Sequence, residues 1–292
     1  MLSTRAIRRK IRTVKNIQKI TDAMRMVAAA KLQRVQAKVA AGRPYSDKMA
    51  ELLNRVAPLA YGVQHPLLEV REPVERIGLV VMAGNRGLCG SFNSSMMRRA
   101  ERYLAQQTAP VTMVTVGKKA GDHFSRRNAT LHARFDGLSA ESSLGEIQRL
   151  AGAIRTLYES REVDQVDIIY SQFISAMEQR PRTLPFLPFR AEPAEEGAAQ
   201  RHESVDYIFE PDAALLMAAL LPRYVDTMVY HLVLESTTSE FGARMVAMSN
   251  ASNNAAEVID NLTLSYNKVR QASITTELLE VVSGANALEQ LV

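Results

Sequence analysis

The stretch ESTTSEFGARMVAMSNASNNAAEVIDNLTLSYNKVRQASITTELLEVVSGANA, residues 235–287, decides the fold of this chain. It holds no proline, and its two glycines lie near its ends. A spacing of four and three residues runs through it, at Phe241, Met245, Met248, Ser252, Ala255, Ile259, Leu262, Tyr266 and Val269. This spacing is typical of a coiled-coil seam, and a helix of this length rises roughly 75 Å. The sequence therefore predicts a long helix that needs a partner along its length.

The N-terminal segment is the predicted partner, because it has a similar period and the opposite charge. Residues 1–43 carry a net charge of +11, whereas residues 235–292 carry −4. This asymmetry indicates either an electrostatic match between two helices or two separate binding sites for different partners. We expect an antiparallel pair, with the first helix reaching about Gly42 and helical pattern resuming after Pro44. Its apolar stripe is predicted at Ile7, Ile11, Val14, Ile17, Ile20, Met24, Val27, Leu32, Val35 and Val39.

Strands and helices alternate between residues 75 and 175, which predicts a small α/β unit with a mostly parallel sheet. The proline-rich residues 173–190 fit an edge strand, residues 191–203 a mobile loop, and Pro222 a bend in the last helix. The fold class is therefore α/β, a long antiparallel coiled coil with an inserted small, Rossmann-like domain. Its expected domains are residues 1–58, 75–205 and 208–292. Strands are expected at 77–82, 111–116, 130–133 and 166–171, and helices at 93–107, 118–127 and 144–160.

Composition excludes several classes of protein. Charged residues make up 23% and hydrophobic residues 47%, as in ordinary folded domains. A single cysteine, Cys89, excludes an internal disulfide and a multi-cysteine zinc site, and no run of eighteen apolar residues spans a membrane. The basic N-terminus resembles a transit peptide, but its apolar spacing continues into the following residues and indicates a structural helix. No aromatic residues interleave with its bases, so nucleic acid is not an expected partner, and its coiled-coil pattern also outweighs a lipid surface.

The glycine-rich turn Gly84 to Ser91 follows a predicted strand and precedes a predicted helix, as phosphate-binding turns do. It lacks both the Gly-Lys-Ser/Thr ending and the G-x-G-x-x-G spacing, which favours a purely structural turn. Cys89 lies beside Arg86, which would lower the pKa of its thiol, but a buried structural thiol is the favoured interpretation. The five histidines show no metal-ligand spacing. We therefore predict no catalytic residue, cofactor or metal.

Four motifs resemble the gamma subunit of F-type ATP synthases, and together they cover essentially the whole chain. The helical signatures are IRRKIRTVKNIQKITDAMRMVAAAKLQRVQ at residues 7–36 and EFGARMVAMSNASNNAAEVIDNLTLSYNKVRQASITTELLEVVSGANAL at residues 240–288. NRGLCGSFN at residues 85–93 resembles the family's DRGLCG turn, with Asn85 in place of the usual acid, and VDYIFEPD at residues 205–212 also matches.

The resemblance implies a non-catalytic rotor shaft that couples ion flow through a membrane ring to ATP chemistry. Its implied partners are the alpha and beta subunits of the catalytic hexamer, the epsilon subunit and the c-ring. The implied location is peripheral, on the cytoplasmic face of a bacterial-type energy-transducing membrane. By motif match, contacts to the catalytic subunits are implied at Met24, Arg244, Arg270, Gln271 and Thr275, and contacts of the foot with the membrane ring at Tyr207 and Glu210.

Two other functions remain open from the residues alone. One is a small nucleotide-dependent enzyme that uses the turn at residues 84–91, and the other is a coiled-coil scaffold with no rotary role. For the rotor, we expect polar groups such as Arg270 and Gln271 to make hydrogen bonds that break and re-form at each step. A large apolar patch at the same place would hold the rotor in one position.

Overall fold

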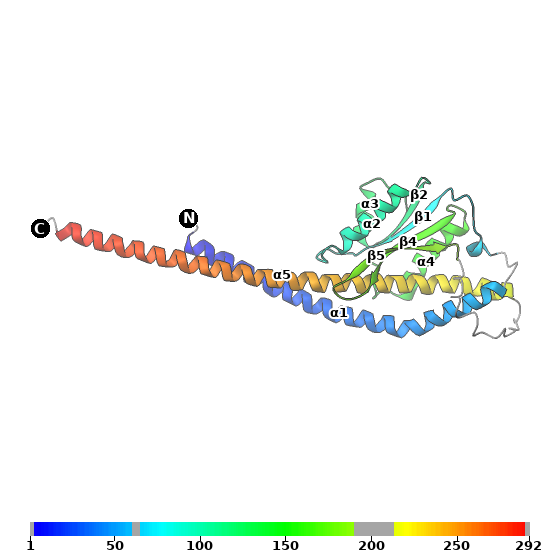
Figure 1. Cartoon of the computed structure of the whole chain (residues 1–292), viewed down its shortest axis with the longest axis horizontal. Coiled ribbons are helices and arrows are strands. Elements are labelled where there is room, and N and C mark those ends of the chain that lie inside the picture. Colours follow the sequence, from blue (N-terminus) through cyan, green and yellow to red (C-terminus); the bar gives the residue numbers. More distant parts are fainter. Residues whose placement is uncertain (1–2, 60–64, 190–212, 290–292) are drawn as a thin grey trace. The chain divides into compact units, whose positions relative to one another are not determined.

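The computed structural model describes residues 3–59, 65–189 and 213–289 (Figure 1). The chain divides into two compact units, one made of Met1–Ala28 with Met245–Val292 and the other of Ala29–Arg244, and the two terminal helices contribute to both. The elements are α1 (Thr4–Leu59), η1 (Pro66–Leu68), β1 (Ile77–Met82), α2 (Phe92–Gln106), β2 (Val111–Val116), α3 (Lys118–Ser125), β3 (Leu131–Phe135), α4 (Leu144–Glu159), β4 (Gln165–Phe173), β5 (Gln179–Leu187) and α5 (Ala213–Glu289).

The first unit is an antiparallel pair formed by the start of α1 and the second half of α5 (Figure 1). The α5 seam is confirmed, because Met248, Ala255 and Ile259 are buried while Leu262, Tyr266 and Val269 are half-buried. The Arg8 guanidinium donates a hydrogen bond to the Tyr266 hydroxyl across the pair. In the described part of this unit no ion pair joins the two helices, since Asp22 pairs with Arg25 of the same helix at 2.8 Å. The opposite net charges therefore do not act through salt bridges here.

The stripe predicted on α1 is only partly correct. Ile7, Ile11 and Val14 face the seam, but Ile17, Ile20 and Val27 are exposed, Ile20 to 59%. The four-three spacing that starts at Ile7 continues instead through the half-buried Gln18 and Arg25 and the buried Thr21 and Ala28. The Thr21 hydroxyl donates to the Gln18 carbonyl oxygen at 3.0 Å, which allows a polar side chain to lie in the seam.

The second unit contains a five-stranded sheet in the order β3-β2-β1-β4-β5. The pairs β1–β2, β1–β4 and β2–β3 are parallel, and β5 pairs with β4 antiparallel at the edge. The predicted strands and helices all occur, and the weak strand extends to Leu131–Phe135. Pro181 and Pro185 lie on β5, where missing amide donors are tolerated at a sheet edge. At the start of α4, Ser143 and Glu146 form a reciprocal capping box.

Helices cover both faces of this sheet. Leu79 and Val81 of β1 pack with α2 and α3, whereas Val80 and Met82 pack with α4 and the first half of α5. The alternation follows from the two-residue period of a strand, and β1 is buried at all six positions. This arrangement is the doubly wound α/β fold with helices on both sides.

Both terminal helices continue through the residues expected to interrupt or bend them. Helix α1 continues through Gly42 and Pro44 to Leu59, and α5 holds Pro222 within its length. Pro44 has no amide hydrogen to donate to the Ala40 carbonyl oxygen, but Ala40 is exposed, so this oxygen can bond to water. The loop expected at residues 191–203 lies outside the described residues. The domain ranges 1–58, 75–205 and 208–292 remain a prediction. They separate the two terminal helical segments from the α/β segment between them.

Candidate partner-binding surface

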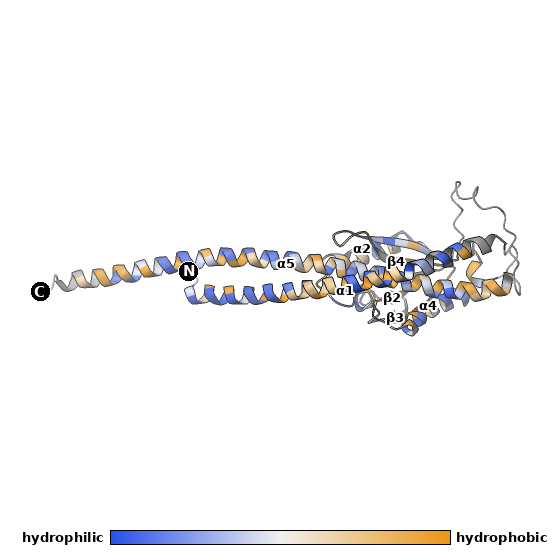
Figure 2. Cartoon of the chain, turned by 90° about the horizontal axis from the view of Figure 1, so that it is seen from below, coloured by the Kyte–Doolittle hydropathy of each residue, from blue (hydrophilic) through white to orange (hydrophobic). Residues whose placement is uncertain are grey.

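The terminal segment of α5, residues 270–283, carries large apolar side chains that no described residue of its unit covers. Ile274, Leu278, Leu279, Val281 and Val282 are exposed, Val281 to 70%. This end of α5 extends past the N-terminus of α1 (Figure 1), and apolar residues recur along it (Figure 2). Soluble monomers rarely leave so many large apolar side chains together in water. The terminal segment is therefore a surface that a partner would cover.

The terminal segment is also amphipathic. With about 100° per residue, the segment divides into an apolar face and a polar face. The predicted contacts Gln271 and Thr275 lie within the apolar face, and the Thr275 hydroxyl donates to the Gln271 carbonyl oxygen at 3.0 Å. The apolar face holds Gln271, Ile274, Thr275, Leu278 and Val282, and the opposite face holds Ser273, Thr276, Glu277 and Glu280. Apolar side chains therefore share this face with the predicted polar contacts, although a large apolar patch was not expected at this place.

The apolar side chains were missed although their spacing was readable. Ile274, Leu278 and Val281 are separated by four and three residues, which is a helical stripe. The stripe was not recognised because it begins where the four-three seam of the paired region ends.

Helix α1 carries a second exposed stripe beside its seam. Ile17, Ile20 and Val27 are exposed on one helical face, and the predicted contact Met24 lies on that face and is half-buried. Eight basic residues and one acidic residue lie between Thr4 and Ala28, and seven of the eight bases are exposed. A partner on this side would therefore meet an apolar stripe bordered by positive charge.

Arg244 belongs to the second unit and is largely enclosed. Its guanidinium pairs with Glu240 at 2.6 Å, reaches the Gly87 carbonyl oxygen at 3.4 Å and lies 5.6 Å from the centre of the Phe241 ring. These contacts join α5 to the glycine-rich turn. The two predicted foot contacts, Tyr207 and Glu210, lie outside the described residues.

Helix α5 fills the crevice where this type of fold binds nucleotides. Such sites lie at the carboxyl ends of the strands where the strand order reverses, which here means β1 and β4. The Ser239 hydroxyl donates to the Ser171 carbonyl oxygen at 3.0 Å at the end of β4. A Cβ atom at Gly84 would lie 2.9 Å from Cδ of Glu240, and one at Gly242 would lie 3.2 Å from the Phe173 ring. The glycines thus let α5 occupy the place that the enzyme alternative would need for its substrate.

Asn85 joins this turn to two other backbone segments, at Lys118 and at residues 137–138. Its Oδ1 accepts hydrogen bonds from the amides of Lys118 at 3.0 Å and Gly137 at 2.9 Å, and its Nδ2 donates to the Leu138 carbonyl oxygen at 3.0 Å. A carboxylate at this position could accept the first two bonds but could not donate the third. The departure from the acidic residue of the family motif therefore adds one hydrogen bond to the turn.

Cys89 is a buried thiol with a raised pKa, so the expected lowering by Arg86 is wrong. Burial is the largest cause of the rise in pKa and the nearby Glu240 carboxylate adds to it, while the Asn93 backbone amide and the Arg244 guanidinium offset part of it. The Sγ atom accepts a hydrogen bond from Asn93 Nδ2 at 3.1 Å. Glu240 is 151 positions further along the chain, so the sequence did not indicate that it lies near Cys89. The neighbouring Arg86 therefore led to the wrong direction of the pKa shift.

Cys89 is therefore expected to react with a thiol reagent at pH 8 on the order of a hundredfold more slowly than the same cysteine in urea-unfolded chain. Because the folded pKa is raised, the neutral thiol stabilises the fold below the unfolded pKa, and this contribution is lost as the pH rises through the folded pKa. The rate of reaction is measured from the absorbance of the coloured thiolate that a disulfide reagent releases when it reacts with Cys89. Equal rates in native and unfolded chain would contradict the buried assignment.

Comparisons with known proteins agree with these features. The family described as ATP synthase matches residues 3–288. The ATP synthase gamma chains of Pelotomaculum thermopropionicum and Desulfitobacterium hafniense are each 44% identical to the chain over 289 residues, which is 99% of this chain and 100% of each relative.

Solved structures add the architectural match. The central stalk and c-ring structure of Tetrahymena thermophila mitochondrial ATP synthase contains a chain with 27% identity and a TM-score of 0.60, covering 80% of this chain and 99% of that one. A chain of the Euglena gracilis mitochondrial ATP synthase, 22% identical, matches the fold with a TM-score of 0.64 over 98% of this chain and 94% of its own. The chain belongs to the ATP synthase gamma chain family and is a non-catalytic, central-stalk subunit of an F-type ATP synthase.

Proposed function

We propose that this gamma subunit transmits torque to a hexamer of alpha and beta subunits through the terminal segment of α5 and the exposed stripe of α1. The observation that carries the proposal is the terminal segment, whose five exposed large apolar side chains lie on a helix end that its unit leaves unpaired. A slender helix end of this kind can be enclosed by a ring on all sides. Turning it changes which subunit meets the apolar face, and this asymmetry imposes different states on the subunits.

The individual contacts follow from the same surface. Gln271 and Thr275 would meet the hexamer together with Ile274 and Leu278, and Arg270 would donate hydrogen bonds beside them. On α1, Met24 and its exposed apolar neighbours would contact the hexamer of alpha and beta subunits. Arg244 is also proposed as a contact, and its pairing with Glu240 would hold it, with the Gly87 turn, in a fixed orientation toward the partner.

The remaining partners are proposed from the family and from the Tetrahymena assembly, whose title names a central stalk and a c-ring. We infer that the epsilon subunit and the membrane c-ring bind this chain at its foot, with Tyr207 and Glu210 among the contacts. Within the described residues, no helix combines the length and the apolarity that a bilayer crossing needs. We propose peripheral attachment through the ring, on the cytoplasmic face of the membrane.

The test is reconstitution of a hexamer that lacks its shaft. Added to that hexamer and a c-ring in vesicles, the full chain is expected to restore ATP-driven proton pumping, measured with a pH-sensitive dye. A chain that ends before Arg270 keeps the described core of both units and is expected to restore much less pumping. Full pumping with the shortened chain would remove the terminal segment from the mechanism, and binding without any pumping by the full chain would favour a static scaffold.

A further inference from the structure

The second unit contains a cavity, open to solvent on one side, to which the proposed stalk contacts assign no role. Its volume is about 1090 Å³, and its walls come from residues 36–46 of α1, residues 224–238 of α5 and the β4–β5 edge of the sheet. Sites for small ligands in proteins commonly have volumes of several hundred to a thousand cubic ångströms. The cavity lies wholly within the unit Ala29–Arg244, so elements of one compact unit form it.

Glu235 places a carboxyl group in the wall of this cavity. Its Oε1 accepts one long hydrogen bond, 3.3 Å, from the Phe173 amide, and no described basic residue lies within ion-pair distance of it. Burial raises the pKa of the Glu235 carboxyl group, and the Phe173 hydrogen bond offsets part of that rise. A half-buried carboxylate that accepts only one long hydrogen bond is stabilised by a cation that binds beside it.

Aromatic rings surround the same space. Tyr170, Phe173, Phe186, Phe189 and Tyr224 line the cavity, and the rings of Phe189 and Tyr224 meet edge to face with centroids 5.1 Å apart. Tyr170 lies near enough to Glu235 that the carboxylate contributes to the raised pKa of its phenol, after burial as the larger cause. Aromatic faces attract organic ammonium groups, and the attraction is stronger where water is excluded.

The other charged groups narrow the chemistry of the ligand. Arg43 and His231 also line the cavity, and each has an interaction partner of its own in the structure. The positive charge of Arg43 opposes a second cationic group on the ligand. Among the described residues no three acidic, cysteine or histidine side chains converge, so the donor set does not match a bound metal ion.

We propose that this cavity binds a monovalent organic ammonium compound with an aromatic or hydrocarbon body, its cation beside Glu235 and its body among the aromatic rings. The site is separate from the terminal segment of α5 and does not depend on the proposed contacts with the hexamer. A ligand there would touch α1, α5 and the sheet edge at once.

The test uses the purified full chain and three soluble probes of one shape. 2-Phenylethylammonium, 2-phenylethanol and 3-phenylpropionate are titrated separately, with binding followed by the NMR signals of the probe. The ammonium compound is expected to bind with a dissociation constant on the order of a millimolar, about tenfold tighter than the alcohol, and the anion weakest. The size of the probe sets this affinity, since small ligands gain little free energy per atom.

Three variants assign the binding to the cavity. Glu235→Gln keeps an acceptor for the Phe173 amide and is expected to bring the affinity for the ammonium probe down to that for the alcohol. Ala40→Phe fills the cavity from the exposed surface of α1 and is expected to weaken all three probes. Glu159→Gln removes an exposed carboxylate outside the cavity and serves as the control without effect. The proposal is overturned if the ammonium probe does not bind at about 20 mM, if the alcohol binds equally well, or if Glu235→Gln leaves its affinity unchanged.

Discussion

Gln271→Leu is expected to slow ATP hydrolysis by the reconstituted complex about tenfold. A leucine buried against the hexamer would stabilise the resting position of the shaft by about 1.5 kcal/mol, and this free energy adds to the barrier of each rotary step. Gln271 is exposed and lies on the face of α5 that also holds Ile274, Leu278 and Val282. At this position, one turn before Ile274, glutamine ends the apolar stripe with a group that can exchange hydrogen bonds as the shaft turns. Leucine would extend the stripe by one more turn of helix.

The matched control is Ser273→Leu, which adds a leucine to the opposite face of the same turn. This change is expected to leave hydrolysis within about twofold of the unmodified chain, since burial on the polar face does not continue the apolar stripe. Steady-state ATP hydrolysis and the stepping rate of single molecules provide the two measurements. The interpretation fails if both leucine variants slow turnover equally, or if Gln271→Leu turns over at the unmodified rate.

Features that repeat along one element were predictable from the sequence. The seam of α5 is visible as spacing because a coiled coil requires contacts every three to four residues along one helix. Strands β1 and β2 match their predicted bounds because both are short apolar runs between turn residues, buried in a parallel sheet. The partner of α5 was also predictable, since α1 is the other long helix among the described elements.

Features that depend on two distant segments were not predictable in this way. Ile17 and Ile20 are as apolar as Ile11, yet only the geometry of the partner helix decides which of them the seam covers. The raised pKa of Cys89 requires Glu240 and the packing of α5. The cavity around Glu235 depends on how α1, α5 and the β4–β5 edge pack together. Its aromatic residues are spread over 54 positions, from Tyr170 to Tyr224. None of these arrangements has a local period.

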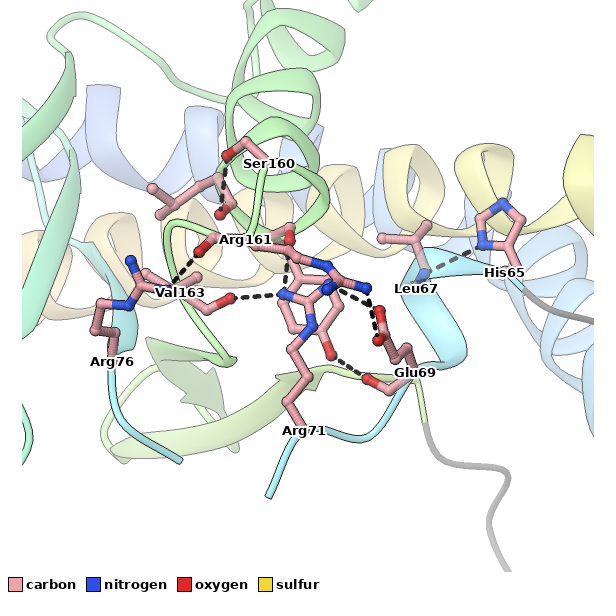
Figure 3. A network of polar contacts seen from close by, with 10 residues as sticks. His65, Leu67, Glu69, Arg71, Arg76, Ser160, Arg161 and Val163 are labelled. Carbon is pink, nitrogen blue, oxygen red and sulfur yellow. Dashed lines mark hydrogen bonds and ion pairs between the residues drawn. The ribbon is translucent and has the colours of Figure 1, made fainter. Parts of the chain in front are cut away.

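The contacts of Arg71 in the second unit were not predictable for the same reason, because its partners Tyr158 and Val163 are distant in sequence. Arg71 lies in the irregular segment before β1, and its side chain is only 10% exposed. Its Nη1 donates to the carbonyl oxygens of Tyr158 and Val163, both at 2.9 Å, and its guanidinium lies 4.2 Å from the centre of the Tyr158 ring (Figure 3). Nη2 bonds to Glu69 Oε2 at 3.2 Å, and the Tyr158 hydroxyl donates to the Glu69 carbonyl oxygen. One side chain thus fastens the entry to β1 onto the turn between α4 and β4.

Arg71→Met is expected to lower the free energy of unfolding of the second unit by about 3 kcal/mol, because two buried carbonyl groups lose a charged donor and the Tyr158 ring loses its cation. Arg161→Met is the matched control, since Arg161 bonds to the same Glu69 carboxylate at 3.0 Å but is 70% exposed. Its loss is expected to change the free energy by less than about 1 kcal/mol. Hydrogen exchange of peptides from β1 and β4 in increasing urea reports on this unit alone. Equal losses in the two variants would show that Glu69 pairing, and not the buried carbonyl contacts, holds the segment, whereas a large loss confined to Arg71→Met would assign the stability to the α4–β4 turn.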